Sequence, residues 1–328
     1  MAQAVIDTIG TVSGVMGIVD FFKDLVPDDP ASGTAVTIKS GYGSVLDDTS
    51  GWGGQISAVY AFDAENQYIG QASNHLVKSG GDYTFTIDQS TASLQSGYIS
   101  VANNNDGTCI ACITVAQHDG SDSNGAWTGD IGKECGQRWY PSDQKAGKIT
   151  DENGAVVDYM PACTWIDKNF TDGTLSAALK FSVGAYGSNV KSTYDSGSWC
   201  DSTVWGEDSK IIAVAPAGKR SLPERPDEML ERLVDAGLLS RGTTAEELCG
   251  SETSWGPDYI GSDKKFCDMS TKKISPLCEL EEVDGCVDFD ETNLAIKKRS
   301  TVARRTVKSH HKSYKTYTQY GKKGSSGV

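Results

Sequence analysis

The sequence predicts a mainly β protein, with a β-sandwich or barrel-like body between an N-terminal amphipathic helix and a C-terminal region. We expect that region to consist of a small helical, Cys-rich appendage and a disordered basic tail. Glycine supplies 36 of 328 residues, and 13 Tyr and 7 Trp outnumber 8 Phe, a composition that favours strands joined by many turns. Short β-forming runs also alternate with clusters of Gly, Asn, Asp and Ser. Finally, all nine cysteines follow residue 100, and basic residues gather at the C-terminal end.

Residues 1–30 form the predicted N-terminal helix, because apolar residues recur at three- and four-residue spacing within 4–26. Gly10, Gly14 and Gly17 lie inside this segment, and each costs about 1 kcal/mol relative to Ala in a helix. We therefore expect another surface to pack closely against them, either the body or a second copy in a homo-oligomer. The alternative is membrane contact through residues 4–26.

Residues 33–215 form the predicted β-sandwich body. Its segment around Thr84 alternates polar and apolar residues, as a half-buried strand does. The stretch 117–178 is looser and rich in turns. The expected strands are Ala35–Lys39, Gln55–Phe62, Tyr68–Gln71, Tyr83–Asp88, Tyr98–Ala102, Cys109–Ala116, Leu179–Tyr186 and Lys210–Ala215.

Residues 216–290 form the predicted linker and helical Cys-rich appendage. Lys219-Arg220, in the linker, is either a processing site or a solvated turn. Pro226 opens a helix that we expect to run through Leu239, and Thr244 with Glu247 predicts a second, capped helical turn.

Residues 291–328 form the predicted tail. It holds ten Lys or Arg and one acid, a net charge of +9, whereas the first 290 residues hold 20 basic and 43 acidic residues, a net charge of −23. Because the tail has few aliphatic residues, we expect it to be disordered and dispensable for folding. The acidic body disfavours binding of nucleic acid.

The cysteines predict disulfides and therefore an extracellular or cell-wall location. Four thiols crowd residues 249–286, and we expect them to pair among themselves. An odd total leaves at least one thiol free. Met1–Asp7 contains no basic residue, so secretion would proceed without a signal peptide of the usual kind. The disulfide candidates are Cys249, Cys267, Cys278, Cys286, Cys135 and Cys163.

No motif in the sequence indicates a catalytic site, a cofactor or a metal. Phosphate-binding glycine loops, a G-x-S-x-G elbow and an H-E-x-x-H helix are all missing from the sequence. His75 and His118 are the two imidazoles expected in the folded part. Cys109 and Cys112 lie three apart in a strand, so we expect them to point to opposite faces and to fill the core or bridge elsewhere.

Several weaker patterns leave alternatives open. Asp106 and residues 118–125 offer oxygen ligands for calcium but miss the spacing of an EF-hand, which favours a polar turn. Glutamates that could pair for glycoside hydrolysis are few in the body, namely Glu65, Glu134, Glu152 and Glu207, and its many aspartates lie in turn contexts, where aspartate is normally a turn former.

The aromatic residues Trp127, Trp139 and Tyr140, with Trp165, would either stack on a glycan or anchor the core of the sandwich. Asn169-Phe170-Thr171 is a glycosylation sequon if the chain is secreted.

Two resemblances accompany these patterns. The runs Asp106–Ile113, Trp127–Gly132 and Pro161–Asp167, with Cys135-Gly136 and Trp139-Tyr140, resemble uncharacterised proteins of filamentous fungi. This resemblance implies a fungal source and no particular activity. The order of an amphipathic helix followed by a β-sandwich, with Ala4–Asp7, is similar to that of actinoporin-like cytolysins.

The leading functional hypothesis is a non-enzymatic protein that binds a protein or glycan partner or assembles with itself, outside the cell or at its wall. The main alternative is a membrane-active toxin or effector that acts through its N-terminal helix. An enzyme whose site residues are dispersed along the chain and an intracellular structural role are the remaining hypotheses.

Overall fold

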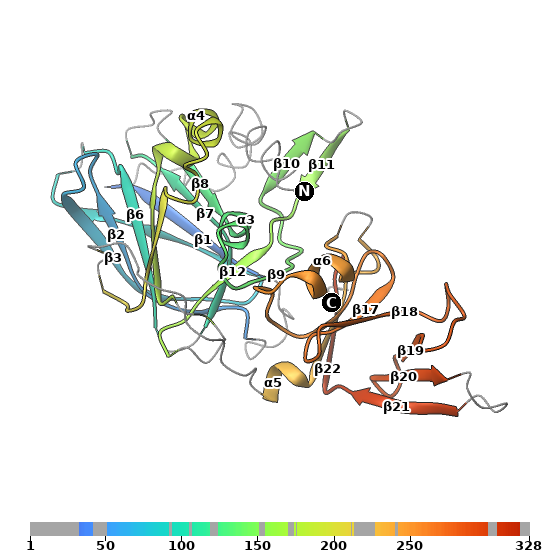
Figure 1. The fold of residues 1–328 in the computed structure, drawn as a ribbon. Helices are drawn as coiled ribbons and strands as arrows, with labels where there is room; N and C mark the ends of the chain where they lie inside the picture. Colours follow the sequence, from blue (N-terminus) through green and yellow to red (C-terminus); the bar gives the residue numbers. More distant parts are fainter. Residues whose placement is uncertain are drawn as a thin grey trace, which may run out of the picture. The chain divides into compact units, whose positions relative to one another are not determined.

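The computed structural model describes the chain in two units (Figure 1). The units span Met1–Pro223 and Glu224–Val328, and we call them unit 1 and unit 2. The described residues are 33–41, 51–91, 94–104, 107–118, 124–150, 155–169, 174, 176–210, 212, 227–239, 242–300 and 307–321. Strands dominate both units, which confirms the mainly β class.

Unit 1 contains two open antiparallel sheets. The first sheet has the order β4-β1-β7-β12-β9, and β8 also pairs with β7. Its strands are β1 (Ala35–Ser40), β4 (Asp82–Thr86), β7 (Thr108–Ala116), β8 (Gly125–Thr128), β9 (Trp139–Tyr140) and β12 (Cys163–Ile166).

The second sheet of unit 1 has the order β14-β13-β6-β2-β3-β5. Its strands are β2 (Gly54–Phe62), β3 (Tyr68–Val77), β5 (Asp88–Gln89), β6 (Tyr98–Asn103), β13 (Ala178–Ser182) and β14 (Thr203–Gly206). The described part of the unit also contains a separate hairpin and three short helices: β10 (Gly147–Thr150), β11 (Val156–Tyr159), α3 (Gly129–Glu134), η1 (Gly184–Tyr186) and α4 (Val190–Asp195).

The core of unit 1 lies between its two sheets. Val36 and Ile113 from the first sheet share one buried cluster with Val59, Val101 and Leu179 from the second. Burial of these β-branched and aliphatic side chains is the main force that holds two sheets face to face. Unit 1 is therefore sandwich-like, and in its described residues neither sheet closes into a barrel.

Most of the predicted strands exist, with shifted ends. The strand expected over Leu179–Tyr186 ends at Ser182, and residues 184–186 form a short 3₁₀ helix instead. Of the strand expected over 210–215, Lys210 and Ile212 are described and lie outside strands, while the other positions fall outside the described residues. The stretch 117–178 contributes five strands of two to four residues, too short to give a clear alternation in the sequence.

Unit 2 is a small β domain rather than the helical appendage that the sequence predicted. One sheet has the order β18-β17-β16-β15-β22, and a second has the order β19-β20-β21. The strands are β15 (Arg232–Asp235), β16 (Asp258–Ile260), β17 (Lys265–Asp268), β18 (Lys273–Pro276), β19 (Val287–Asp290), β20 (Ala295–Ser300), β21 (Val307–Ser313) and β22 (Thr316–Gln319), and the helices are α5 (Asp227–Leu230) and α6 (Ala245–Gly250).

The prediction of a helix over residues 226–239 is wrong beyond the first helical turn. Helix α5 ends at Leu230, and β15 follows, with Leu233 and Val234 buried between neighbouring strands. Long-range pairing with β16 and β22 overrides the local helical pattern there. The second turn is confirmed: the Thr244 side chain accepts a hydrogen bond from the Glu247 N–H at the start of α6.

The prediction of a disordered tail is wrong for residues 295–300 and 307–319. β20 pairs with β19, β21 pairs with β20, and β22 lies beside β15. Although the tail is poor in aliphatic residues, Ile296 and Tyr314 are buried in the core of unit 2. Few apolar residues suffice here, because the tail completes two sheets and pairs its charges with acids of the same unit.

The N-terminal helix, including Gly10, Gly14 and Gly17, lies outside the described residues, as do Lys219-Arg220 and residues 322–328. Among the helices that are described, none is long and apolar enough to cross a membrane.

Candidate functional site

Four disulfides join eight of the nine cysteines. Cys109 bonds to Cys163 and Cys135 to Cys200 in unit 1, whereas Cys249 bonds to Cys267 and Cys278 to Cys286 in unit 2. The expected pairing of the four C-terminal cysteines among themselves is thus confirmed, and Cys135 and Cys163 are also oxidised. Four disulfides are compatible with an extracellular protein.

Cys112 is the free thiol, and it is buried. The expectation that Cys109 and Cys112 do not bond to each other is confirmed, but the assumed alternation of faces does not hold. The register of β7 against β1 shifts between Lys39 and Ser40 and leaves Ala111 without a register partner there, which is the pattern of a β-bulge. As a result Ile110 and Ile113, also three apart, both lie in the core cluster.

The aromatic residues proposed for glycan stacking are in the core, so that proposal needs correction. Trp127, Trp139 and Tyr140 are at most 1% exposed, and a buried ring offers no face to a sugar. Trp127 belongs to the core between the sheets, and the ammonium of Lys133 lies 4.2 Å from the ring centroid of Trp139. Buried Trp165 stacks on Trp52 with 5.6 Å between centroids.

One exposed and two half-buried tyrosines lie instead on the outer face of the second sheet: Tyr68, Tyr60 and Tyr98. Tyr60 on β2 is in register with Ser100 on β6, and Phe62 is in register with Tyr98 on β6 and with Tyr68 on β3. Residues in register on adjacent strands share a face. We call the outer face around Tyr60, Tyr68 and Tyr98 the tyrosine face.

The rings of the tyrosine face differ in their exposure. Tyr68 is 50% exposed, Tyr60 and Tyr98 are half-buried, and Phe62 is 4% exposed. Phe62 meets Tyr68 edge to face, with 6.1 Å between centroids. Burial, with a smaller contribution from nearby Tyr68, raises the pKa of Tyr60, so its hydroxyl stays neutral and can both donate and accept hydrogen bonds.

Lys180 packs against two aromatic rings of the tyrosine face, Phe62 and Tyr98. This lysine on β13 is in register with Ser100, and it is 7% exposed. Its ammonium lies 3.4 Å from the Phe62 ring centroid and 5.7 Å from that of Tyr98, and it donates to Asn66 Oδ1 at 2.5 Å. Burial lowers its pKa, and in the described part of the chain it pairs with no carboxylate.

Amide side chains border the tyrosine face. Asn66 and Gln67, in the turn between β2 and β3, and Gln71 on β3 are exposed. Gln71 accepts a hydrogen bond from the Tyr68 hydroxyl at 3.2 Å. An amide offers two donors and one acceptor with two lone pairs, a set that suits hydroxyl-rich ligands.

No protein-family model matches the chain. No curated protein matches its sequence. The resemblances to fungal proteins and to actinoporin-like cytolysins therefore stay predictions, and functional inference must start from this chain's own residues.

The remaining sequence candidates do not converge on a site in the described residues. His75 stacks on Tyr83, with 3.3 Å between ring centroids. Residues 119–123 of the expected polar turn lie outside the described part of the chain, as do Asp106, Glu152 and Phe170. Within the described part, no group of three or more His, Cys, Asp or Glu side chains is placed to hold a metal ion.

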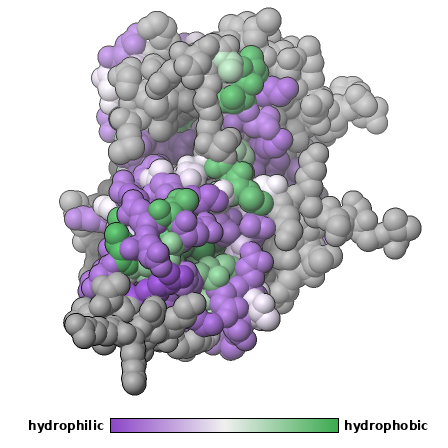
Figure 2. All heavy atoms as spheres, turned by 90° about the vertical axis from the view of Figure 1, so that its right-hand side faces the viewer, coloured by the Kyte–Doolittle hydropathy of each residue, from purple (hydrophilic) through white to green (hydrophobic). Residues whose placement is uncertain are grey.

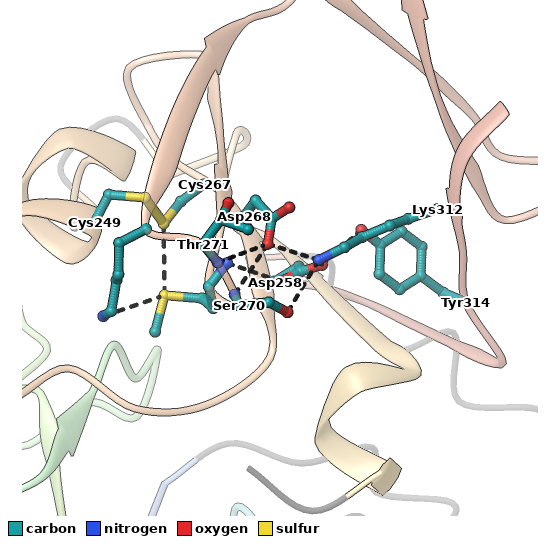
Figure 3. A network of polar contacts seen from close by, with 10 residues as sticks. Cys249, Asp258, Cys267, Asp268, Ser270, Thr271, Lys312 and Tyr314 are labelled. Carbon is teal, nitrogen blue, oxygen red and sulfur yellow. Dashed lines mark hydrogen bonds and ion pairs between the residues drawn. A yellow bond between two sulfur atoms is a disulfide. The ribbon is translucent and has the colours of Figure 1, made fainter. Parts of the chain in front are cut away.

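Unit 2 contains a buried polar network that joins its tail to its sheet (Figure 3). Lys312 Nζ lies 2.8 Å from Asp258 Oδ2 and 2.7 Å from Asp268 Oδ1, and the Tyr314 hydroxyl donates to Asp258 Oδ2 at 2.9 Å. The Met269 N–H donates to the other oxygen of Asp258. These groups bind one another, so the network is structural.

The tyrosine face as a whole was not recognisable in the sequence, because its members are scattered from residue 60 to residue 180. Strand register alone brings them together. A signal existed only in part: Tyr60 and Phe62 lie two apart in a predicted strand and therefore on one face.

Proposed function

We propose that the protein is a non-enzymatic binding protein that acts outside the cell or at a cell wall and holds a glycan on its tyrosine face. The observation that carries this proposal is the exposure of Tyr68, flanked by half-buried Tyr60 and Tyr98, on one face of a sheet. Aromatic rings with an exposed face pack against the C–H side of a sugar ring, and the hydroxyl of tyrosine adds a hydrogen bond.

The neighbours of these rings favour a glycan over a protein partner. The cores of protein interfaces are depleted of charge and enriched in Tyr, Trp, Phe, Met and Arg. Three exposed amides lie close to Tyr68 along the chain: Asn66, Gln67 and Gln71. Amide side chains suit a ligand that carries many hydroxyl groups, because an amide and a hydroxyl can each both donate and accept hydrogen bonds.

Binding to polysaccharides tests this proposal. The full chain is mixed with insoluble glucan, chitin, cellulose and pectin, and depletion from solution is measured; isothermal titration with soluble oligosaccharides follows for whichever glycan is bound. Replacing Tyr68 by Ala removes one stacking ring, which is worth about 1 kcal/mol, so we expect affinity to fall by about fivefold.

Tyr83→Ala is the matched control, because Tyr83 is also an exposed tyrosine, at 37%, but lies on β4 of the other sheet. It should bind as the wild type does. Equal weakening by the two substitutions, or no retention of the wild-type chain on any of the polysaccharides, would contradict a glycan site on the tyrosine face.

A further inference from the structure

A cavity of about 210 Å³ lies in unit 2, and nothing above assigns it a role. Ile260, Leu277 and Val287 line its floor, and all three belong to the buried core of the unit. Half-buried Phe289 forms part of the wall. Sites for drug-sized ligands measure about 300–1,000 Å³, so this cavity suits a single side chain.

Three charged residues of the cavity wall are bound within unit 2. Lys264 donates to the Gly237 carbonyl oxygen at 2.6 Å. Asp235 accepts from the Tyr317 hydroxyl and from the Gly237 N–H, both at 2.7 Å. Asp288 accepts two hydrogen bonds from Arg299, at 2.8 and 3.2 Å. These contacts hold the shape of the cavity.

Two further carboxylates at the cavity are available to a ligand. Glu279 and Glu291 both line the cavity and are exposed, and within the described residues neither has a side-chain hydrogen bond or an ion pair. Glu279 lies in the loop closed by the Cys278–Cys286 disulfide, and Glu291 follows β19. Their charges lie on the two segments that flank Val287–Phe289.

An aromatic wall complements these charges. The Phe289 ring packs against Tyr317 at 4.8 Å between centroids, which fixes its orientation beside the cavity. A cation over the face of an aromatic ring gains electrostatic attraction in addition to its attraction to carboxylates.

We propose that this cavity binds a basic side chain, lysine or arginine, presented by a partner peptide or protein. The aliphatic stem of such a side chain would cover Ile260, Leu277 and Val287, and its cationic end would meet Glu279, Glu291 and the Phe289 ring. This occupant uses both the apolar floor and the charged rim, whereas a metal ion would leave the floor unused. On the face of the molecule that Figure 2 shows, the coloured residues are mostly hydrophilic with small hydrophobic areas.

The proposal is tested by titrating the ¹⁵N-labelled full chain with the capped peptide acetyl-Gly-Lys-Gly-amide and following its amide resonances by NMR. The same peptide with arginine should act alike, and a norleucine peptide keeps the stem but lacks the charge. We expect saturable shifts at residues 279 and 287–291 with lysine and arginine and not with norleucine. Glu279→Gln and Glu291→Gln should each weaken binding about threefold, as loss of an exposed ion pair does.

Glu281→Gln is the matched control, because it removes the same charge from the same loop at an exposed residue that does not line the cavity. It should leave the affinity unchanged. Equal shifts with the norleucine peptide would overturn the charge recognition. Shifts spread over the acidic surface, or binding that persists in the Glu279→Gln/Glu291→Gln double variant, would overturn the site. This readout is independent of glycan binding by unit 1.

Discussion

Cys112 illustrates how the surroundings of a single residue decide its chemistry. Its side chain is 2% exposed on β7, and burial, the main cause, raises the pKa of the thiol to about 12. Since the thiolate is the reactive form, we predict that the native chain at pH 8 takes up no iodoacetamide. After unfolding without reductant it should take up one equivalent.

Intact mass measures this labelling, and the same spectrum reports the disulfides. Uptake by the native chain would contradict the burial of Cys112. Uptake of more than one equivalent by the unfolded, unreduced chain would mean that at least one of the four disulfides is not formed.

Lys312 is the residue on which the buried network of unit 2 depends (Figure 3). Lys312→Met leaves Asp258 and Asp268 without their cation, and loss of one partner of a buried pair is strongly destabilising. We predict a loss of about 3 kcal/mol of stability in unit 2, measured by hydrogen exchange of the amides of β16 and β17.

Lys315→Met is the control for that substitution. Its side chain is 76% exposed and pairs with Glu231 at 2.7 Å; surface pairs are worth at most about 1 kcal/mol. Equal effects of the two substitutions would contradict the structural role of the network.

The same network predicts a dependence on pH. Burial alone would raise the pKa of Asp268, but the hydrogen bond and charge of Lys312, together with backbone hydrogen bonds from Ser270 and Thr271, hold the pKa below its ordinary 3.8. A lowered folded-state pKa contributes stability that is present above 3.8 and is lost as the pH falls through the lower, folded value.

We therefore expect hydrogen exchange in β16 and β17 to accelerate, beyond its intrinsic pH dependence, as the pH falls below 3.8. Asp268→Asn should flatten this response. A variant that keeps the full wild-type response would show that Asp268 is not the titrating group.

Among the elements, those set by local chemistry were predictable from sequence. The local part of the cap on α6 joins a side chain to a backbone N–H only three residues away, Thr244 to Glu247. The strands of the sandwich are marked by alternation within a few residues. The bulge in β7 was not predictable, because it appears only against the register of β1.

The elements that failed prediction depend on distant partners. β15 pairs in parallel with β16 and with β22, about 80 residues away along the chain, so its local helical pattern was misleading. The tail was predicted to be disordered because it has few aliphatic residues, and the acids that pair with its basic residues precede residue 291. Arg299 binds Asp288 and Glu282, and Lys312 binds Asp258. The tyrosine face was hidden for the same reason.

Truncation after Asp290 tests the role of the tail elements. It removes β20, β21 and β22, the buried side chains of Ile296 and Tyr314, and Lys312. We predict that unit 2 loses its cooperative thermal transition in calorimetry, whereas truncation after Gly321 keeps every described element and should retain it. An unchanged transition after truncation at Asp290 would restore the expectation of a dispensable tail.

At the scale of the whole molecule, part of the positive charge of the C-terminal tail is paired with carboxylates of unit 2. Within the described residues, four basic side chains of the tail, Lys297, Arg299, Lys312 and Lys315, pair with acids of unit 2: Glu231, Asp258, Asp268, Glu282, Asp288 and Asp290. The +9 charge seen in the sequence is therefore partly balanced where it lies.

Each disulfide lies within one of the two units. Two disulfides lie in unit 1 and two in unit 2, and none joins the units. Each unit also has its own buried cluster, and a domain with its own core can fold alone.

If a specific protease site replaces residues 218–223, cleavage should give two fragments that separate without reductant under denaturing conditions. Each fragment should carry two disulfides, and each should refold with the amide spectrum that it has in the intact chain. Fragments that stay covalently linked until reduction would contradict the disulfide pairing, and a unit 2 fragment that fails to refold would mean that its small core needs unit 1.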